Sequence, residues 1–266
     1  MRGKSKKILS VLFFCLVIFW AFSAQAITWS VSNDPSLYGY LDQNTIPTIG
    51  SVACGPTSAV NSFVFLQDAY PSVYTTSLVP ASSGVITNAD MVAVAQILAS
   101  ATYMNTTVPN GTYWTNFLPA IEKYTEAKDP GVTVYNSSLL TGSSTAWQFI
   151  YQQLLLGSDL EILIQKTSST SGANHFLTVD GLSWNDQTNR GTLSGVDPWT
   201  GSAYSSTIFY DSTSNRLDLS YAGLSWIYGG ASERPSVSVP EPSAMLLLGF
   251  GLVGLVGFSR RKKFRK

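Results

Sequence analysis

The order of segments limits the folds that this chain can adopt, because helical patterns come first and β-prone segments follow them. Apolar residues recur at helical spacing over residues 54–68, 91–104, 113–127 and 145–156. Thr87 and Asp90 form a capping box before the second of these patterns. Short β-prone segments separated by turn residues cover residues 160–164, 176–182, 191–196, 203–210 and 224–228. Helices followed by successive strands predict an α+β domain with an antiparallel sheet.

The first helical pattern has a cysteine at its start. It begins Cys54-Gly55-Pro56, and Pro56 suits a first helical turn because its missing N–H is no loss there. A thiol at a helix N-terminus lies near free N–H groups and the positive end of the helix dipole, which favour the reactive thiolate. Free cysteine is also among the most buried residue types, so a small apolar core residue is the alternative interpretation of Cys54.

The N-terminal 26 residues are typical of an export signal. A basic start precedes the apolar stretch Ile8–Phe22, and small residues follow up to Ala26. We expect signal peptidase to cleave after Ala26, and an uncleaved membrane anchor is the alternative. Export would leave residues 27–235 as one folded domain, a length that can bury a sizeable core.

The C-terminal residues 236–266 have three successive parts. A polar spacer with Pro240-Glu241-Pro242 precedes 15 apolar residues or glycines at 244–258, and a basic cluster closes the chain. Such a run is marginal as a membrane span, since a hydrocarbon core of about 30 Å needs about 20 helical residues. The basic cluster would stay on the cytoplasmic side. A plain membrane anchor is one interpretation of this segment.

This order of Pro-Glu-Pro, apolar run and basic end resembles the PEP-CTERM sorting tail of Gram-negative bacteria. The resemblance implies transient anchoring in the inner membrane and removal of the tail by an exosortase. It also implies release to the cell surface, often alongside exopolysaccharide.

Charge and residue counts exclude several function classes. Residues 27–240 hold six basic and 15 acidic residues, a net charge of −9, which argues against nucleic acid or anionic lipid as a partner. Of the two cysteines, Cys15 lies in the expected signal peptide, and His175 is the sole histidine. No internal disulfide, usual zinc site or cofactor is therefore expected. An imidazole base for a thiol nucleophile can only pair Cys54 with His175.

His175 and Asp197 lie on the two strands of an expected hairpin. With the turn between Ser183 and Arg190, the two side chains are near cross-strand neighbours. Asp197 would then orient the imidazole and favour its cation. A register slip of one residue would put them on opposite faces. The alternative is a core histidine and an Asp-Pro turn.

Together these residues resemble a known enzyme family. The pattern Cys54-Gly55-Pro56-x-Ser58, then His175-Phe176 with Gly181, then Asp197-Pro198 is similar to papain-like cysteine peptidases of the bacteriocin-leader-processing, double-glycine type. The resemblance covers roughly residues 40–200 and implies a papain-like α+β fold: a helical part with Cys54 at a helix N-terminus, then an antiparallel sheet that carries His175 and Asp197.

The same resemblance implies catalytic roles. Cys54 would be the nucleophile, His175 the base and then the acid, and Asp197 its orienting partner. The family places a glutamine shortly before the cysteine as an oxyanion donor. The upstream candidate here is Gln43, 11 residues away, and the backbone N–H of Cys54 is the alternative donor.

The leading hypothesis is an exported, surface-sorted thiol hydrolase, a peptidase or amidase that acts through an acyl-enzyme. The expected substrate is an uncharged or weakly cationic peptide or amide. Trp114, Trp184 and Trp199 are compatible with a cleft for it, and core packing is the alternative interpretation of these aromatic residues. The expected partners are signal peptidase, exosortase and an exopolysaccharide matrix. Two alternatives remain: a catalytically silent papain-like surface or matrix-binding protein, and a transglutaminase-like acyl transferase.

Overall fold

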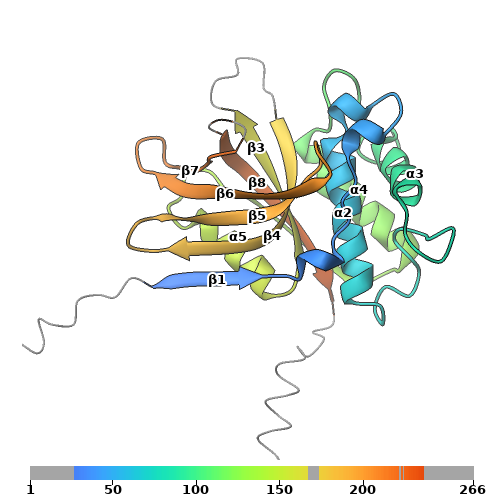
Figure 1. Ribbon diagram of the computed structural model, residues 1–266, viewed down its shortest axis with the longest axis horizontal. Helices are drawn as coiled ribbons and strands as arrows, with labels where there is room; N and C mark the ends of the chain where they lie inside the picture. Colours follow the sequence, from blue (N-terminus) through green and yellow to red (C-terminus); the bar gives the residue numbers. More distant parts are fainter. Residues whose placement is uncertain (1–26, 167–173, 222, 224, 237–266) are drawn as a thin grey trace, which may run out of the picture.

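The computed structural model describes residues 27–166, 174–221, 223 and 225–236, and these form four α-helices and eight β-strands (Figure 1). The helices are α2 (Cys54–Ala69), α3 (Asn88–Ala99), α4 (Trp114–Lys128) and α5 (Ala146–Leu155). The strands are β1 (Thr28–Ser32), β2 (Thr133–Leu139), β3 (Asp159–Lys166), β4 (Asn174–Asn185), β5 (Arg190–Asp197), β6 (Ser202–Asp211), β7 (Arg216–Leu219) and β8 (Ser225–Pro235). Short 3-10 turns occupy Pro35–Leu37, Gln43–Thr45 and Gly50–Val52.

The expected signal peptide, residues 1–26, and the apolar segment 244–258 lie outside the described residues. Within the described part of the chain, no helix combines the length and the apolar character that a bilayer span needs.

Six strands, β3 to β8, form a closed antiparallel barrel. Each pairs with the next one along the chain, and β8 pairs with β3 to close the ring. Strands β1 and β2 lie outside the ring and pair with β4 and β8. The expected papain-like α+β fold is therefore wrong, because the strands that follow the helices close into a six-stranded barrel. The β3–β8 pairing joins the two ends of the strand series, and no local sequence pattern specifies such a long-range contact.

The barrel strands are covered on both faces. Helices α2, α3 and α4 stand together on one side of the strands (Figure 1). Their apolar residues form one core cluster with Leu163, Phe176, Val196 and Ala231 of the strands. Alternate strand residues such as Leu177 belong to a second cluster, to which α5 contributes. Since successive side chains point to opposite faces, each central strand joins both cores.

The four helices begin close to where the sequence pattern predicts. The capping box is present, with Thr87 Oγ1 accepting from the N–H of Asp90 and the Asp90 carboxylate accepting from the N–H of Thr87. Helix α3 ends at Ala99, however, and does not continue to residue 104. The chain turns back at Ser100, which is extended, and at Asn105, whose φ of +50° is incompatible with a right-handed helix.

Strands β1, β2 and β7 are absent from the sequence-based prediction. β1 alternates exposed and half-buried residues, and its pairing with Ser183 and its neighbours on β4 holds it in place. β2 is likewise an outer strand that pairs along β8. Such strands depend on their partners for stability and carry a weak apolar pattern of their own.

Candidate active site

Cys54 is the first residue of α2, and its side chain is buried with 8% exposure. No side chain caps this helix start, so the first backbone N–H groups are left for other partners. One turn along, the Ser58 hydroxyl lies 3.0 Å from the Thr178 hydroxyl on β4. This buried contact ties the start of α2 to the strand that carries His175.

His175 and Asp197 are brought together across the β4–β5 hairpin. Nε2 of His175 lies 2.8 Å from Oδ1 of Asp197. Since Nε2 is engaged by the carboxylate, Nδ1 is the ring nitrogen left for Cys54. The arrangement gives the imidazole one anionic partner on each side once the thiol is ionised.

A β-bulge at Asp180 places the side chains of His175 and Asp197 on the same face of the hairpin. Gly181 pairs with Ser194 and Val179 pairs with Gly195, which leaves Asp180 as an extra residue in β4. Because side chains alternate along a strand, the insertion puts His175 on the same face as Asp197. An unshifted ladder would turn the imidazole to the opposite face.

The Asp197 carboxylate is held by several donors besides His175. The N–H of Trp199 donates to Oδ1 at 2.8 Å, and the hydroxyl of Thr200 donates to Oδ2 at 3.4 Å. The phenol of Tyr221 also donates to Oδ2. The ring of Tyr221 is nearly parallel to the imidazole of His175, with centroids 6.2 Å apart. These contacts fix both the carboxylate and the ring.

The electrostatics of the site favour a charged thiol and imidazole. Burial raises the pKa of the Cys54 thiol, but the interaction with His175 and two backbone N–H groups outweigh it and lower the pKa. Burial lowers the pKa of His175, whereas its contacts with Asp197 and Cys54 raise that pKa to about 9. Burial raises the pKa of Asp197, and its hydrogen-bond donors lower it below the ordinary value. The two shifts together favour a thiolate beside an imidazolium over a neutral thiol beside a neutral imidazole.

Gln43 is buried beside the chain that leads into Cys54. Its side chain is 1% exposed, and Nε2 donates to the carbonyl of Gly50 at 2.7 Å. Its backbone N–H donates to the carbonyl of Pro198, also at 2.7 Å. An amide nitrogen carries two hydrogens, and the bond to Gly50 uses one. Gln43 lines the same pocket as Cys54.

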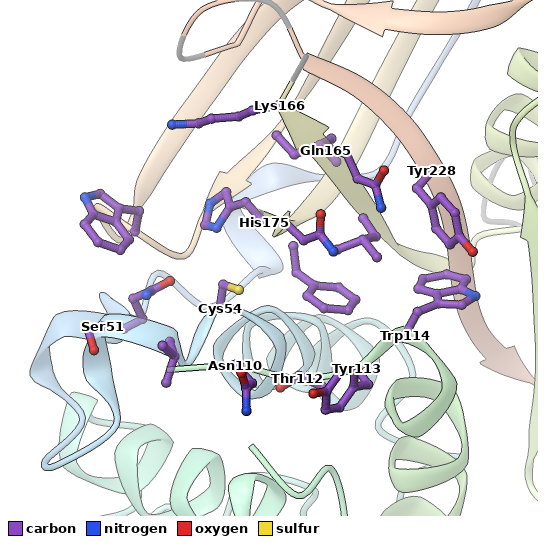
Figure 2. Close-up of a pocket in the computed structure, with 18 of the residues that line it drawn as sticks. Ser51, Cys54, Asn110, Thr112, Tyr113, Trp114, Gln165, Lys166, His175 and Tyr228 are labelled. Carbon is purple, nitrogen blue, oxygen red and sulfur yellow. The ribbon is translucent and has the colours of Figure 1, made fainter. Parts of the chain in front are cut away.

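Cys54 and His175 open onto a pocket of about 1030 Å³. Figure 2 shows the two side chains facing each other at one end, with Trp114 and Tyr228 at the other. Thr112 and its neighbours before α4 line one wall of the pocket. Among the described residues, its lining includes no Asp or Glu.

For the three tryptophans the sequence left both a cleft and a core position open, and the structure places two in the pocket and one in the core. Trp114 and Trp199 line the pocket, and Trp199 is 50% exposed. Trp184 is fully buried in the second cluster and stacks on Trp147, with centroids 5.4 Å apart. Trp184 therefore has no access to a substrate, and its role is in packing.

Comparison with known proteins identifies the C-terminal segment. A family model described as the PEP-CTERM protein-sorting motif matches residues 238–262. The chain carries a PEP-CTERM sorting tail. The PEP-CTERM tail marks it as an exported, surface-sorted protein and makes exosortase its processing partner. No curated protein matches the chain in sequence.

Two parts of the site have no signal in the sequence. Tyr221 reaches Asp197 only after two intervening strands, so no motif links them. In the segment around residues 109–115, the sequence pointed to Trp114 alone, and the pocket lining at residues 109–113 had no signal. Only the fold brings either of them to the pocket.

Proposed function

We propose that this chain is an exported thiol hydrolase, a peptidase or amidase, in which Cys54, His175 and Asp197 are the catalytic residues. The observation that carries the proposal is the half-buried imidazole of His175, which is bonded to Asp197 and interacts with a thiol of lowered pKa. A nucleophile, a base and an orienting group in contact are the arrangement that covalent acyl transfer requires.

In the first step, the Cys54 thiolate attacks the carbonyl carbon of an amide, and the carbonyl electron pair moves to oxygen. The tetrahedral intermediate then expels the amine, which takes its proton from the imidazolium of His175, and a thioester to Cys54 remains. In the second step His175 removes a proton from water, which attacks the thioester. The product is a carboxylic acid, and the thiolate and imidazolium are restored.

The oxyanion of each tetrahedral intermediate needs hydrogen-bond donors. We assign this role to the second amide hydrogen of Gln43 and the backbone N–H of Cys54. The support is that Gln43 lines the pocket and is fixed by its bond to Gly50. Preorganised donors of this kind contribute about 3–4 kcal/mol each to the transition state.

The pocket lining favours an uncharged substrate segment. Its aromatic residues offer apolar contact area, and Lys166 and His175 are the charged groups among the described lining residues. A strongly cationic side chain would find no carboxylate there. We therefore propose an uncharged, partly apolar peptide or amide as the substrate class.

Export and sorting would precede this activity. We propose that signal peptidase removes residues 1–26, that segment 244–258 anchors the chain transiently in the inner membrane, and that exosortase then releases it. An enzyme at the surface could act on peptides or on proteins of an exopolysaccharide matrix.

Two measurements on wild type and Cys54→Ala test the hydrolase proposal. Turnover of a library of uncharged peptide amides should require Cys54, and mass spectrometry should detect a thioester on the peptide that contains it. Alkylation of Cys54 by iodoacetamide should stay fast below the ordinary thiol pKa of about 8.5. Alkylation that follows the ordinary thiol pKa, together with absent turnover, would refute the proposal. Binding of isolated exopolysaccharide would in that case favour a matrix-binding protein. Incorporation of an added amine in place of water would show acyl transfer.

A further inference from the structure

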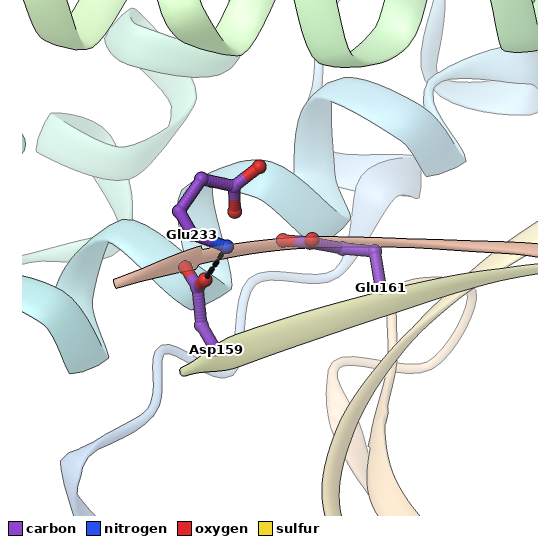
Figure 3. A group of neighbouring side chains, drawn as sticks. All are labelled: Asp159, Glu161 and Glu233. Atoms are coloured by element: carbon purple, nitrogen blue, oxygen red, sulfur yellow. Dashed lines mark hydrogen bonds between the residues drawn. The ribbon is translucent and has the colours of Figure 1, made fainter. Parts of the chain in front are cut away.

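Three carboxylates lie together between α2 and the barrel, away from the pocket. Asp159 and Glu161 are alternate residues of β3, and Glu233 is the β8 residue that pairs with Asp159. All three are 0% exposed. Figure 3 shows the three side chains converging, with the backbone N–H of Glu233 bonded to Oδ1 of Asp159 at 2.8 Å.

These carboxylates have almost no partners within the described part of the chain. Oδ2 of Asp159 and both side-chain oxygens of Glu161 and Glu233 are buried and make no hydrogen bond there. The two ion pairs of the described residues lie elsewhere, at His175–Asp197 and Arg216–Asp218. Burial of an unpaired carboxylate is costly, so a group of three in contact requires a compensating charge or protons.

A hydroxyl from the helix points independently to a ligand at this place. Ser62 on α2 is 0% exposed, and its Oγ makes no hydrogen bond of normal geometry to any described residue. Burial and the neighbouring Glu233 raise the pKa of the Glu161 carboxyl well above its ordinary value, and Ser62 lies close enough to offset part of that rise. A neutral oxygen donor thus faces the cluster from the element opposite the strands.

We propose that Asp159, Glu161, Glu233 and Ser62 form a calcium site. The three carboxylates supply up to six oxygens and Ser62 a seventh, within the six to eight oxygen ligands that Ca²⁺ takes. The carboxylate ligand atoms all lie within 4.8 Å of one another. One ion can therefore contact all three residues, and the number of carboxylates favours Ca²⁺, because Mg²⁺ is usually bound by one or two carboxylates and keeps several waters.

A calcium ion at this site would hold helix α2, which carries Cys54, against the barrel. Ser62 is eight residues after Cys54 on α2, about 12 Å along the helix axis. Calcium held there would join α2 to β3 and β8 without touching the pocket. The inference does not depend on thiol chemistry, because its direct readout is metal binding. The shortage of nitrogen and sulfur ligands in the sequence argues against a zinc site but does not bear on a set of oxygen ligands.

The test is calcium binding by the full chain in detergent after treatment with a chelator. Equilibrium dialysis should give one Ca²⁺ per chain. At a calcium concentration a hundred times the dissociation constant, the melting temperature should rise by about 5–10 °C. Magnesium at the same concentration should produce a smaller rise.

Matched variants locate the ion. Glu161→Gln keeps the side-chain shape and should weaken calcium binding at least tenfold, whereas Glu122→Gln, an exposed position on α4, should bind as wild type. If Glu161→Gln does not fold, Ser62→Ala provides the same test with a several-fold loss of affinity. Wild-type chain that neither binds calcium nor gains stability from it overturns the proposal, as does unchanged binding in a folded Glu161→Gln chain.

Discussion

The hydroxyl of Tyr221 donates a hydrogen bond to Oδ2 of Asp197, the carboxylate oxygen that does not face Nε2 of His175. Its ring also lies nearly parallel to the His175 imidazole, at an interplanar angle of 11°. Tyr221 therefore positions two members of the proposed triad. Tyr221→Phe keeps the ring and removes the donor, and hydrogen bonds to charged groups contribute about 1.5–3 kcal/mol. We expect kcat/KM to fall about 10- to 100-fold, mostly in kcat.

The rate of Cys54 alkylation separates a positioning role of Tyr221 from a general loss of structure. Loss of the Tyr221 donor should raise the pKa of Asp197, weaken its hold on His175 and slow alkylation of Cys54 at neutral pH. Tyr204→Phe is the matched control, because the Tyr204 ring contacts Tyr221 but its buried hydroxyl makes no hydrogen bond to described residues. Equal effects of the two variants on alkylation would contradict a positioning role for Tyr221.

The pH dependence of turnover should be bell-shaped. The acid limb follows formation of the Cys54 thiolate, whose pKa is lowered. The alkaline limb follows loss of the imidazolium proton, because His175 must protonate the leaving amine and its pKa is raised to about 9. We expect kcat/KM for an uncharged amide to decline as the pH rises through about 9. An alkaline limb near the ordinary histidine value of about 6.5 would contradict this ion pair.

Asp197→Asn tests whether the charge of Asp197 is what raises the pKa of His175. The amide can still accept a hydrogen bond from Nε2 but removes the negative charge, which helps to raise the pKa of His175. The alkaline limb of the profile should therefore move to lower pH, and alkylation of Cys54 should need higher pH than in wild type. A variant with reduced activity but an unmoved alkaline limb would show that Asp197 acts on geometry alone.

The helices were predictable from the sequence because their apolar spacing and end signals are local. Gly157 follows α5 with a φ of +70°, as expected of a glycine stop. The long strands β4 and β5 were predictable for the same reason. The closed barrel was not, because its closure is a pairing of Asp159–Lys166 with Ser225–Pro235, far apart in the chain.

The sequence named Cys54, His175 and Asp197, which the structure brings together, but it predicted neither Tyr221 nor the way in which the hairpin aligns these residues. Counting from the turn suggested that His175 and Asp197 oppose each other, whereas the ladder pairs Thr178 with Val196 and places His175 further along the strand. The bulge at Asp180 nevertheless puts His175 and Asp197 on the same face of the hairpin. At the bulge the Ser194 hydroxyl donates to the Asp180 carboxylate across the hairpin, and single-sequence patterns do not encode that contact.

Gln43→Ala tests the assigned oxyanion donor. Removing one such donor costs about 10²–10³ in kcat in enzymes of this chemistry, with little change in KM. The same substitution removes the bond to Gly50, so the melting temperature has to be measured alongside the kinetics. Alkylation of Cys54 at neutral pH should be retained, since His175 and Asp197 are untouched. A fall in kcat of less than tenfold in a folded variant would leave the Cys54 N–H as the main donor.

Two adjacent glycines of β8 give a matched test of the pocket wall. A Cβ at Gly229 would lie 2.7 Å from the ring of Trp114, which lines the pocket, while a Cβ at Gly230 would lie 2.9 Å from the ring of Phe149. Successive strand residues point to opposite faces, so the two substitutions add the same methyl group on opposite sides of the strand.

Both changes overpack the protein, at a cost of about 1–3 kcal/mol. Gly229→Ala should also displace Trp114 and raise KM for apolar peptide amides several-fold, whereas Gly230→Ala should lower the melting temperature and leave KM unchanged. Neither substitution touches Cys54 or His175, so the pH profile of alkylation should be that of wild type in both. If the two variants change KM equally, Trp114 is not part of the substrate-binding wall and the pocket in use lies elsewhere along the cleft.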